Sequence, residues 1–577
     1  MSSHPQRRKS MDYPSDFSLS QSSTETEENP GTSEGGHTMT AKISSRFNEI
    51  ISNSILNHSG PPAVYQLRPK KEKIGTLTRV TVGERNPNKI NKTILLLGET
   101  GAGKSTLVNA LLNYSIGVKF EDEIWFQIVE EEKDEEELDK EEEENLADSQ
   151  TSDVIVYEIF GFEDQTLPYS LTIIDTPGYG DTREIKQDDI ITHRLLDLFG
   201  ADDGVCEVTA VCLIMKAADN RLTDRLKYVF DAIMSLFGKD VEKNTVALFT
   251  YSDGGNPKNA LKALRAGRFK CAKNKKDPIY FQFNNKEITE RTEERKSTFE
   301  AAWRVTEEGM VGFGAFLERS KPQSLMKTLK VLNERVRLKA CIQNLTERIE
   351  LSEEKQREFE QTEEALKKYD GKMQKNKNFT VEVDEVYKAK EEIDSGRRFL
   401  IFYKAATCCT VCQENCHYPG CTKAWNPESC EVMKDGHCTV CTGKCPVSAH
   451  VKEEWRYVIK TRRVQNTLEE IKEKFEKNKS ESEKKSSLLE NIKKEMNQLR
   501  AEKKQFLDEC YHHVLRLEQI ALKADSASTV FYLDFLIEKM KEERDTEKVQ
   551  KLEEMRSLVS EGTLAAVKYK FGKMFKK

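Results

Sequence analysis

The stretch "GETGAGKS", from Gly98 to Ser105, constrains the fold of this 577-residue chain more than any other feature. It lies between a strand-like run, "TILLL", and a helix-like run, "STLVNALLNY". Glycines at this spacing let the backbone wrap around a phosphate, with N–H groups pointing inward and the helix N-terminus adding positive potential. Lys104 is expected to reach the β and γ phosphates as a catalytic residue, and Ser105 to ligate Mg²⁺. The expected binding residues are Gly98, Glu99, Thr100, Gly101, Ala102, Gly103, Lys104, Ser105 and Thr106.

The same pattern of strand followed by helix continues from Lys89 to about Lys330. Apolar runs alternate there with amphipathic helical patterns such as "RLTDRLKYVFDAIMSLFG". The expected strands are "KTILLLGE", "LTIIDTPG", "VTAVCLIM", "TVALFTY" and "PIYFQF". This alternation predicts an α/β fold with a mostly parallel sheet and helices on both faces. The acidic run at 130–145 is predicted to be a solvated loop.

A second loop indicates which nucleotide class the cradle takes. Asp175 ends an apolar strand and Gly178 follows three residues later, an arrangement that resembles the G3 box of GTPases. The resemblance implies that Asp175 holds the Mg²⁺ ion and its waters, and that the Gly178 amide senses the γ phosphate. An ATPase would more typically have Glu directly after the Asp, and this chain has Thr176.

A later strand end offers residues that could read the base. Thr250 and Asp253 form a T-x-x-D arrangement that resembles the Asn/Thr-Lys-x-Asp box, with Tyr251 in place of the usual Lys. A carboxylate there can accept hydrogen bonds from guanine N1–H and from its exocyclic amine, which adenine does not offer. Asn284 and Asn285 follow another strand, and two interpretations stay open for them: a base-contacting loop or an ordinary turn.

The hydrolytic parts of the site are less regular. Thr151 is the expected switch I residue, a catalytic residue and Mg²⁺ ligand, with Ser152 as its rival. Tyr179 stands where Ras-like GTPases have a water-orienting Gln. Because a phenol ring cannot position water as an amide does, we expect slow intrinsic hydrolysis, with a partner subunit supplying the missing group.

Together, "GETGAGKSTLVNALL" and "IIDTPGYGDT" resemble the septin-like branch of P-loop (TRAFAC-class) GTPases, and specifically the immunity-associated GTPases (GIMAP), across roughly residues 90–300. The resemblance implies GTP or GDP as ligand, Mg²⁺ as cofactor, and a homodimer formed through the G domain, in immune or membrane-associated settings. The T-Y-S-D box and the cysteine-rich region described next depart from the best-known members.

Nine of the 14 cysteines lie between Cys408 and Cys445, and the octets "CTVCQENC" and "CTVCTGKC" repeat one pattern. Cys409, Cys412, Cys438 and Cys441 have the paired C-x₂-C spacing of a tetrahedral Zn²⁺ site. A second site is expected from Cys416, Cys421, Cys430 and Cys445, with Cys408, His417, His437 and His450 as alternates. The ligand pairing stays open. We expect structural zinc rather than redox thiols or disulfides.

Leucine-rich segments flank the cysteines on both sides. Helix-seam spacing is kept by Leu325, Leu329, Leu332, Val336, Leu345 and Ile349, and later by Leu468, Ile471, Phe475, Leu489, Ile492, Met496, Leu499 and Phe506. Two interpretations stay open: an antiparallel coiled-coil hairpin with the cysteines at its tip or elbow, or separate helices that fold back on the globular domain. Either arrangement would offer protein partners a helical surface.

Composition limits the remaining choices. A third of the residues are charged, the net charge is −7, and no run of 18 apolar residues or signal peptide is present, so we expect a cytoplasmic protein. The charge gives no indication of nucleic-acid binding. The tail "KYKFGKMFKK" is consistent either with weak contact to an anionic membrane or with a solvated end.

These patterns divide the chain into seven segments. They are a disordered tail at 1–40, a lead-in segment at 41–88, a P-loop G domain at 89–323, a helical arm at 324–404, a zinc module at 405–450, a second arm at 451–510, and C-terminal helices with a basic tail at 511–577. The predicted function is a slow, guanine-nucleotide-dependent switch or scaffold. Alternatives are a nucleotide-insensitive zinc-braced scaffold, a zinc-hook ATPase, for which the second ATPase half is missing after 510, and a RING-type ubiquitin ligase, whose ligand order does not match.

Overall fold

The structure is a computed structural model that describes residues 47–74, 77–130, 153–180, 185–219, 221–287, 291–369, 380–393, 405–418, 426–467 and 481–571. The chain divides into a unit at 1–52, of which residues 47–52 are helical, and a unit at 53–577, to which all that follows refers. Several predictions lie outside the described residues: the disordered tail, most of the acidic run, Thr151 with Ser152, and Cys421.

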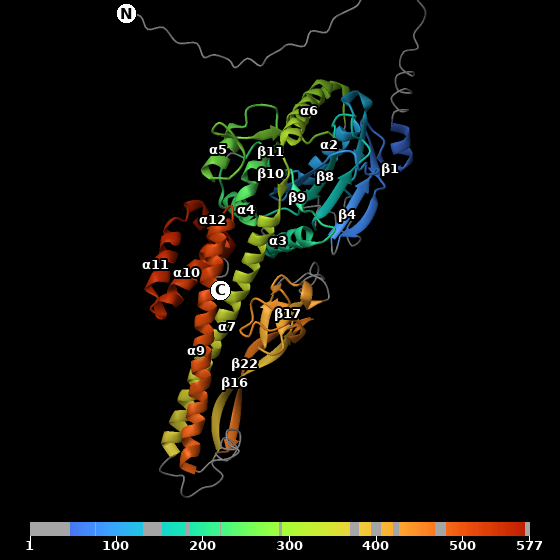
Figure 1. Ribbon diagram of the computed structural model, residues 1–577. Helices are drawn as coiled ribbons and strands as arrows, with labels where there is room; N and C mark the ends of the chain where they lie inside the picture. The colour runs from blue at the N-terminus through green and yellow to red at the C-terminus, as the bar shows by residue number, and fades with distance from the viewer. Residues whose placement is uncertain are drawn as a thin grey trace, which may run out of the picture. The chain divides into compact units, whose positions relative to one another are not determined.

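An eight-stranded sheet forms the centre of the nucleotide domain, in the order β14-β11-β10-β5-β8-β7-β4-β3 (Figure 1). The β7–β8 and β3–β4 pairs are antiparallel and the other neighbours are parallel, so the sheet is mixed, with mostly parallel pairs. The strands are β3 Lys70–Ile74, β4 Leu77–Val82, β5 Asn91–Gly98, β7 Ile155–Ile159, β8 Ser170–Asp175, β10 Ala210–Lys216, β11 Thr245–Thr250 and β14 Tyr280–Gln282. All five expected strands are present. Ile94 to Leu97 are fully buried, which explains why β5 reads as a continuous apolar run rather than an alternating one.

Five helices accompany this sheet, and α2 packs against β5 and β8. They are α2 Lys104–Ile116, α3 Ile185–Gly200, α4 Asp224–Leu236, α5 Lys258–Ala266 and α6 Lys296–Arg319. A small three-stranded sheet consists of β1 Ser54–His58, β2 Ala63–Leu67 and β6 Ile124–Gln127. Two short strand pairs are β9 Glu207–Val208 with β15 Gln323–Ser324, and β12 Lys273–Asn274 with β13 Asp277–Pro278. The 3-10 turns are η1 Phe120–Asp122, η2 Lys239–Asn244 and η3 Glu293–Arg295. Thr223 caps α4, because its side chain accepts a hydrogen bond from the Leu226 N–H.

A long helical pair follows the nucleotide domain. Helices α7 Met326–Tyr369 and α9 Glu481–Ile520 lie side by side (Figure 1). Ion pairs join Arg348 to Glu502 and Lys355 to Glu495, so residue numbers rise along one helix as they fall along the other and the pair is antiparallel. Three further helices follow α9 in the described part of the C-terminal region: α10 Ala527–Glu542, α11 Thr546–Ser557 and α12 Glu561–Phe571.

The structure differs from the expected helical arms in one respect. Strands β16 Thr380–Glu392 and β22 Trp455–Thr467 form an antiparallel ribbon between the helices and the cysteines. Opposite charges face each other across this ribbon, as where Arg462 Nη2 lies 2.7 Å from Glu385 Oε2. The charged composition of these segments is shared by exposed helices and by solvated ribbons, so composition alone did not distinguish the two.

The cysteine-rich module follows β16. Its elements are β17 Ala406–Cys409, β18 Glu414–His417, η4 Pro427–Ser429, β19 Met433–Lys434, β20 His437–Cys438, η5 Val447–Ala449 and β21 His450–Glu453. The module contacts the flanks of both long helices rather than their far ends: Glu414 is paired with Arg348 of α7, and Lys444 Nζ lies 2.7 Å from Glu509 Oε2 of α9. Among the described residues, no helix is long and apolar enough to cross a bilayer.

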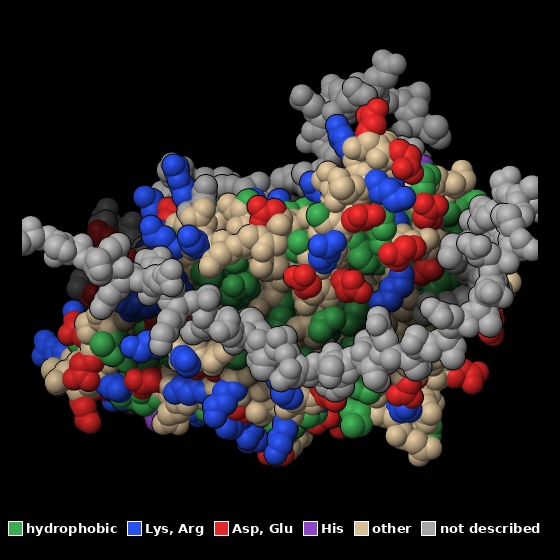
Figure 2. All heavy atoms as spheres, turned by 90° about the horizontal axis from the view of Figure 1, so that it is seen from above, with side chains coloured by type: hydrophobic (Ala, Val, Ile, Leu, Met, Phe, Trp, Pro, Cys, Tyr) green, Lys and Arg blue, Asp and Glu red, His purple; other side chains and the backbone are tan. Residues whose placement is uncertain are grey.

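Figure 2 shows the protein from the top of Figure 1. On this face, Lys and Arg side chains are interspersed with Asp and Glu side chains, and hydrophobic groups appear between them.

Candidate nucleotide site and thiol module

The phosphate loop starts where β5 ends, at Gly98, and continues into the first turn of α2. Gly101 and Gly103 have φ values of +71° and +86°, a left-handed backbone that favours glycine. A Cβ added to Gly103 would lie 2.4 Å from Asn285 Nδ2, so this glycine is also required by a close approach. The backbone of the loop is therefore curved as a phosphate cradle requires.

Lys104 lies buried at the start of α2, with 6% of its surface exposed. Its Nζ donates a hydrogen bond to the Glu99 carbonyl oxygen at 3.0 Å. Burial lowers the pKa of Lys104 to about 8, although the nearby Asp175 and Glu99 carboxylates act in the opposite direction. A phosphate would supply the negative charge that a buried ammonium needs.

Two of the three expected Mg²⁺ ligands, Ser105 and Asp175, are adjacent. Ser105 Oγ donates a hydrogen bond to Asp175 Oδ2 at 2.9 Å. Their proximity follows from the sheet, because β5 and β8 are parallel neighbours with Leu96 paired to Asp175. The next residue, Thr176, fixes the strand end by donating its Oγ1 proton to the Leu96 carbonyl at 2.8 Å. One hydroxyl and one carboxylate oxygen, both hard donors, are thus placed where they would hold Mg²⁺.

The loop around Gly178 lies directly on the phosphate loop. A Cβ added to Gly178 would come within 2.3 Å of Thr100 Cα. The Tyr179 N–H donates to the Gly98 carbonyl at 3.0 Å, and the Thr100 N–H donates to the Tyr179 carbonyl at 3.4 Å. The Tyr179 side chain is buried with 1% exposure, so it is held away from solvent. A change on the phosphate side of this loop would therefore move Tyr179.

Three of the expected base-side residues hold loops together. Thr250 Oγ1 donates to the Ala102 carbonyl at 2.6 Å, and Asn285 Nδ2 donates to the Gly103 carbonyl at 3.1 Å. Asn284 Nδ2 donates to the Ser252 carbonyl at 2.6 Å. These contacts join the ends of β11 and β14 to the phosphate loop and to each other, which gives both asparagines a defined structural role.

Asp253 differs from those three because it is exposed. Its Oδ1 accepts a hydrogen bond from the Gly255 N–H at 2.8 Å, which fixes the carboxylate at the rim of the site. Tyr251, which replaces the usual Lys, has a left-handed φ of 51° and lies under Lys216, whose Nζ is 5.8 Å from the ring centroid. Lys216 escaped the sequence reasoning, although its place at the carboxyl end of β10 could have indicated it.

Glu287 also escaped the sequence reasoning. Its Oε1 accepts hydrogen bonds from Thr306 Oγ1 at 2.5 Å and from the Asn285 N–H at 3.3 Å. Its carboxylate is buried, and burial raises its pKa. The residue supports the Asn285 turn from behind, and no motif in the sequence points to such a role.

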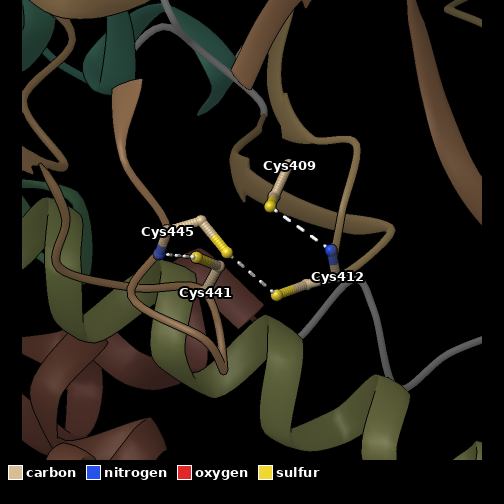
Figure 3. A group of neighbouring side chains, drawn as sticks. All are labelled: Cys409, Cys412, Cys441 and Cys445. Carbon is tan, nitrogen blue, oxygen red and sulfur yellow. Dashed lines mark hydrogen bonds between the residues drawn. The ribbon is translucent and has the colours of Figure 1, made fainter. Parts of the chain in front are cut away.

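The structure arranges the thiols differently from the C-x₂-C pairs. Cys409, Cys412, Cys441 and Cys445 form one group, and Cys416, Cys438, Cys441 and His450 form another. Figure 3 shows the first group, in which two thiols from the β17 turn face two from the later turn. Within each group the possible ligand atoms lie within 4.8 Å of one another. β17 pairs with both β18 and β21, which brings Cys409, Cys416 and His450 close together, so the ligand groups are interleaved.

Backbone N–H groups point at these sulfurs. Val440 N and Cys441 N both donate to Cys438 Sγ at 3.3 Å, and Cys412 N donates to Cys409 Sγ at 3.3 Å. Cys445 N donates to Cys441 Sγ at 3.2 Å. Such bonds favour thiolate over thiol, and thiolate is the form that ligates a metal. The donor set, mainly sulfur with one imidazole, fits zinc.

The remaining predicted or alternate ligands lie elsewhere. Cys430 belongs to a third group with His417 and Glu431, in which His417 Nδ1 is 3.3 Å from Cys430 Sγ. Cys408 Sγ donates to Asn415 Oδ1 at 3.5 Å on the other side of β17. His437 is exposed and belongs to none of the three groups found among the described residues.

Residues 88–193 match a family model described as Septin. This segment contains the phosphate loop, the Ser105–Asp175 pair and Gly178. No curated protein matches the chain. The immunity-associated branch stays a prediction of the sequence alone.

Solved structures with a similar fold include GTPases. Toc33 from Arabidopsis thaliana in complex with GDP and Mg²⁺ is 17% identical, with a TM-score of 0.26, over 40% of this chain and 86% of that chain. A structure of chloroplast translocon components, whose dimerisation is important for their GTPase activity, is 16% identical, with a TM-score of 0.23, over 38% and 84%. Elongation factor SelB from Methanococcus maripaludis with a GTP analogue is 11% identical, with a TM-score of 0.23, over 41% and 36%. Because these TM-scores are low, the assignment of this domain rests on the family match and on the loop geometry.

Proposed function

Because residues 88–193 carry a septin-like P-loop G domain that binds GTP, we propose that the chain is a guanine-nucleotide-dependent switch or scaffold with slow GTP hydrolysis. The observation that carries the proposal is the convergence of three parts at the carboxyl ends of parallel strands in one sheet. These parts are the phosphate loop after β5, the Ser105–Asp175 pair, and the exposed Asp253 after β11.

Guanine preference is assigned to Asp253. Its carboxylate is exposed at the rim and fixed by the Gly255 N–H, so it is free to accept from the N1–H and amine of guanine. Adenine has an acceptor at N1 and no amine at C2, so it would leave the carboxylate unsatisfied. Thr250, Asn284 and Asn285 support this edge by holding the loops that surround it.

Slow hydrolysis follows from Tyr179. The residue after Gly178 is Tyr179, whose buried phenol has no side-chain amide to orient the attacking water. Its backbone is hydrogen-bonded to the phosphate loop, which holds the residue in place. We propose that a second copy of the chain, docked through the G domain, supplies the missing group. The rate of GTP hydrolysis per chain should then rise with protein concentration. A fast rate per chain that does not depend on protein concentration would contradict this part of the proposal.

The thiol module is proposed to bind structural zinc. In support, its thiols gather into four-ligand groups and receive backbone N–H bonds, and it has little apolar core of its own. The module would brace α7 and α9 and present a surface to protein partners. Its reduced thiols suit a reducing compartment, so we propose a cytoplasmic location.

The test of nucleotide binding is a titration of the full chain with fluorescent GDP and Mg²⁺, competed separately by GTP and by ATP. We expect GTP to compete, ATP to fail, and Lys104→Ala to lose binding, because the buried ammonium is the charge that meets the phosphates. Lys258→Ala, at the exposed start of α5, is the matched control and should bind normally. Equal competition by ATP would remove Asp253 as the base reader and leave a zinc-braced scaffold as the better account.

Metal removal tests the zinc module separately. A zinc-selective chelator, with Mg²⁺ kept in excess, should increase hydrogen exchange in residues 405–418 and 426–453 while GDP affinity stays the same. If the metal-free chain kept both its circular dichroism and its melting profile, zinc would not be structural.

A further inference from the structure

Cys441 belongs to both four-ligand groups. The first group contains Cys409, Cys412 and Cys445, and the second contains Cys416, Cys438 and His450. We propose that these side chains form a binuclear zinc centre in which the Cys441 thiolate bridges the two ions. This inference rests on the zinc module proposed above, and it adds the number of ions and the shared ligand.

The number of donors leads to the bridge. Two tetrahedral zinc ions need eight ligand positions. The two groups together offer seven side chains, six cysteines and one histidine. Sharing one thiolate makes up the difference, and Cys441 is the residue that lies within reach of both sets. A single ion would use four donors and leave the other three, which are buried or partly buried, without a metal.

The spacing of the sulfurs fits a metal and excludes a disulfide at this position. Cys412 Sγ and Cys445 Sγ lie 3.6 Å apart (Figure 3). A disulfide would place them at about 2.05 Å. Zinc–sulfur bonds of about 2.3 Å with tetrahedral angles place two sulfurs about 3.8 Å apart. The Cys412–Cys445 distance is therefore close to the edge length of a zinc–thiolate tetrahedron.

His450 completes the second group. Its Nδ1 lies 2.9 Å from the Pro446 carbonyl oxygen, a bond that requires the proton on Nδ1 and leaves Nε2 with its lone pair. His450 is 5% exposed, and its Nε2 is buried without a hydrogen-bond partner among the described residues. A ligating imidazole typically donates its other N–H to a carbonyl in this way. The buried Nε2 is thus oriented and available for a metal.

Charge also favours two ions over one. Six thiolates carry six negative charges, so one Zn²⁺ would leave a net charge of −4 and two would leave −2 by subtraction. The centre is mostly buried, and a buried net charge is costly. The backbone N–H bonds to Cys409, Cys412, Cys438 and Cys441 reduce the remaining cost.

The first measurement is zinc per chain, by native mass spectrometry of the full-length protein. Relative to wild type, Cys412→Ser should lose one ion, because it damages one group, and Cys441→Ser should lose two. Cys408→Ser is the matched control, a buried neighbour in neither group, and should lose none. Any ion at His417, Cys430 and Glu431 would be present in every variant, so the differences are unaffected.

A second measurement needs no variant and so does not depend on variant folding. Wild-type protein loaded with ¹¹³Cd should give two thiolate-ligated signals that split each other through the shared sulfur. Two mutually uncoupled signals, or a Cys441→Ser protein that loses a single ion, would overturn the bridge while leaving the zinc module intact. A wild-type chain without zinc would overturn both, and GDP titration of the same samples reports independently on the nucleotide proposal.

Discussion

The carboxylate of Asp253 is placed to set the base preference of the site, and its charge can be changed with little change in shape. Asp253→Asn replaces one acceptor by a donor, so it should weaken GTP binding by roughly 10-fold or more and improve binding of xanthosine triphosphate, whose ring offers a carbonyl at C2. Competition titrations against fluorescent GDP measure both changes. Asp277→Asn, an exposed carboxylate in the same domain, is the control. Unchanged base preference would mean that Asp253 does not contact the base.

Lys104 gives the site a pH dependence. Because burial holds its pKa near 8, the free protein loses this charge as the pH rises above 8, and nucleotide binding must restore the proton. GDP affinity should therefore be constant below about pH 8 and fall up to tenfold per pH unit above it. Without nucleotide, the unfolded chain holds the proton on this lysine more tightly than the folded chain does, from about pH 8 up to the ordinary lysine pKa of 10.5. The contribution of Lys104 to the free energy of unfolding therefore rises with pH over this range.

Calorimetry in two buffers of different ionisation enthalpy checks this directly. Binding at pH 9 should take up close to one proton, and binding at pH 7 should take up little. An affinity that does not change from pH 7 to pH 9.5 would mean that Lys104 stays charged in the free protein.

At this scale the sequence located the phosphate loop, Asp175 and Gly178, because each carries its own spacing. It did not assign the roles of Asn284 and Asn285, which depend on carbonyls brought near by the fold. Lys216 was missed for the same reason, because it acts on Tyr251. Glu287 was missed because its partner Thr306 is distant in the sequence, and because no motif marks its contact with the nearby Asn285.

Among the elements, the junction of α4, α7 and α10 depends on one buried cation. The Arg335 guanidinium donates to the Ser235 carbonyl at 2.8 Å, the Lys523 carbonyl at 2.8 Å and Ser526 Oγ at 2.7 Å. Burial lowers its pKa to about 10, so it remains charged at neutral pH. Arg335 lies on α7, so it links α4 of the nucleotide domain to α7 and to the segment that leads into α10.

Arg335→Met keeps an unbranched apolar chain about as long as the aliphatic part of the arginine and removes every donor. We expect the local stability of this junction to fall by about 3 kcal/mol, because buried carbonyls lose their partners. Hydrogen exchange at residues 523–530 should become roughly 100-fold faster, while Arg265→Met, at an exposed ion pair, should change nothing there. Equal hydrogen-exchange rates at residues 523–530 in the two variants would show that the hydrogen bonds of Arg335 add no stability.

The long helices were predictable because Leu332, Val336, Met496 and Phe506 keep a helical spacing, and the structure buries all four. The β16–β22 ribbon was not predictable from composition. Glu385 and Arg462 stabilise it through a pairing whose register appears only once the two strands are adjacent. The spacing of apolar residues along the sequence thus predicted the helices, whereas the ribbon depends on contacts between two strands that are distant in the sequence.

At the scale of the whole molecule, the last helix touches the loop that follows Gly178. Tyr569 Oη donates to the Gly180 carbonyl at 3.4 Å, and its ring lies 5.2 Å from that of Tyr228 in α4. A cavity of about 320 Å³, lined in part by Tyr179, lies between α4, α7 and α10. This space gives the loop room to move, so nucleotide state and the position of α12 are expected to be coupled.

We predict that a non-hydrolysable GTP analogue, relative to GDP, speeds hydrogen exchange in α12. The reason is that the Gly178 amide would turn toward the γ phosphate and draw Gly180 away from Tyr569. Helix α11 packs mainly on α10, whereas α12 packs on α4, so α11 serves as the internal control within the same protein. Identical exchange of α12 in both nucleotide states would separate the C-terminal helices from the switch.

The arrangement at this scale was the least predictable. Sequence spacing placed the thiols between two helical segments, and it left open whether they would lie at a tip. Their actual place beside α7 and α9 depends on pairs such as Glu414 with Arg348, whose partners are distant along the chain. Such contacts leave no periodic pattern in either segment.

The ribbon that holds the thiol module also has a bearing on how such a chain arises. Glu392 and Trp455 are paired directly across β16 and β22, so the backbone enters and leaves the module at adjoining points. That is the geometry of an insertion: a short turn joining the two strands would close the ribbon and omit everything between them. Recombination could therefore replace the segment between β16 and β22 with another domain without changing the path of α7 and α9. We expect relatives that share these two helices and carry a different domain between the two strands.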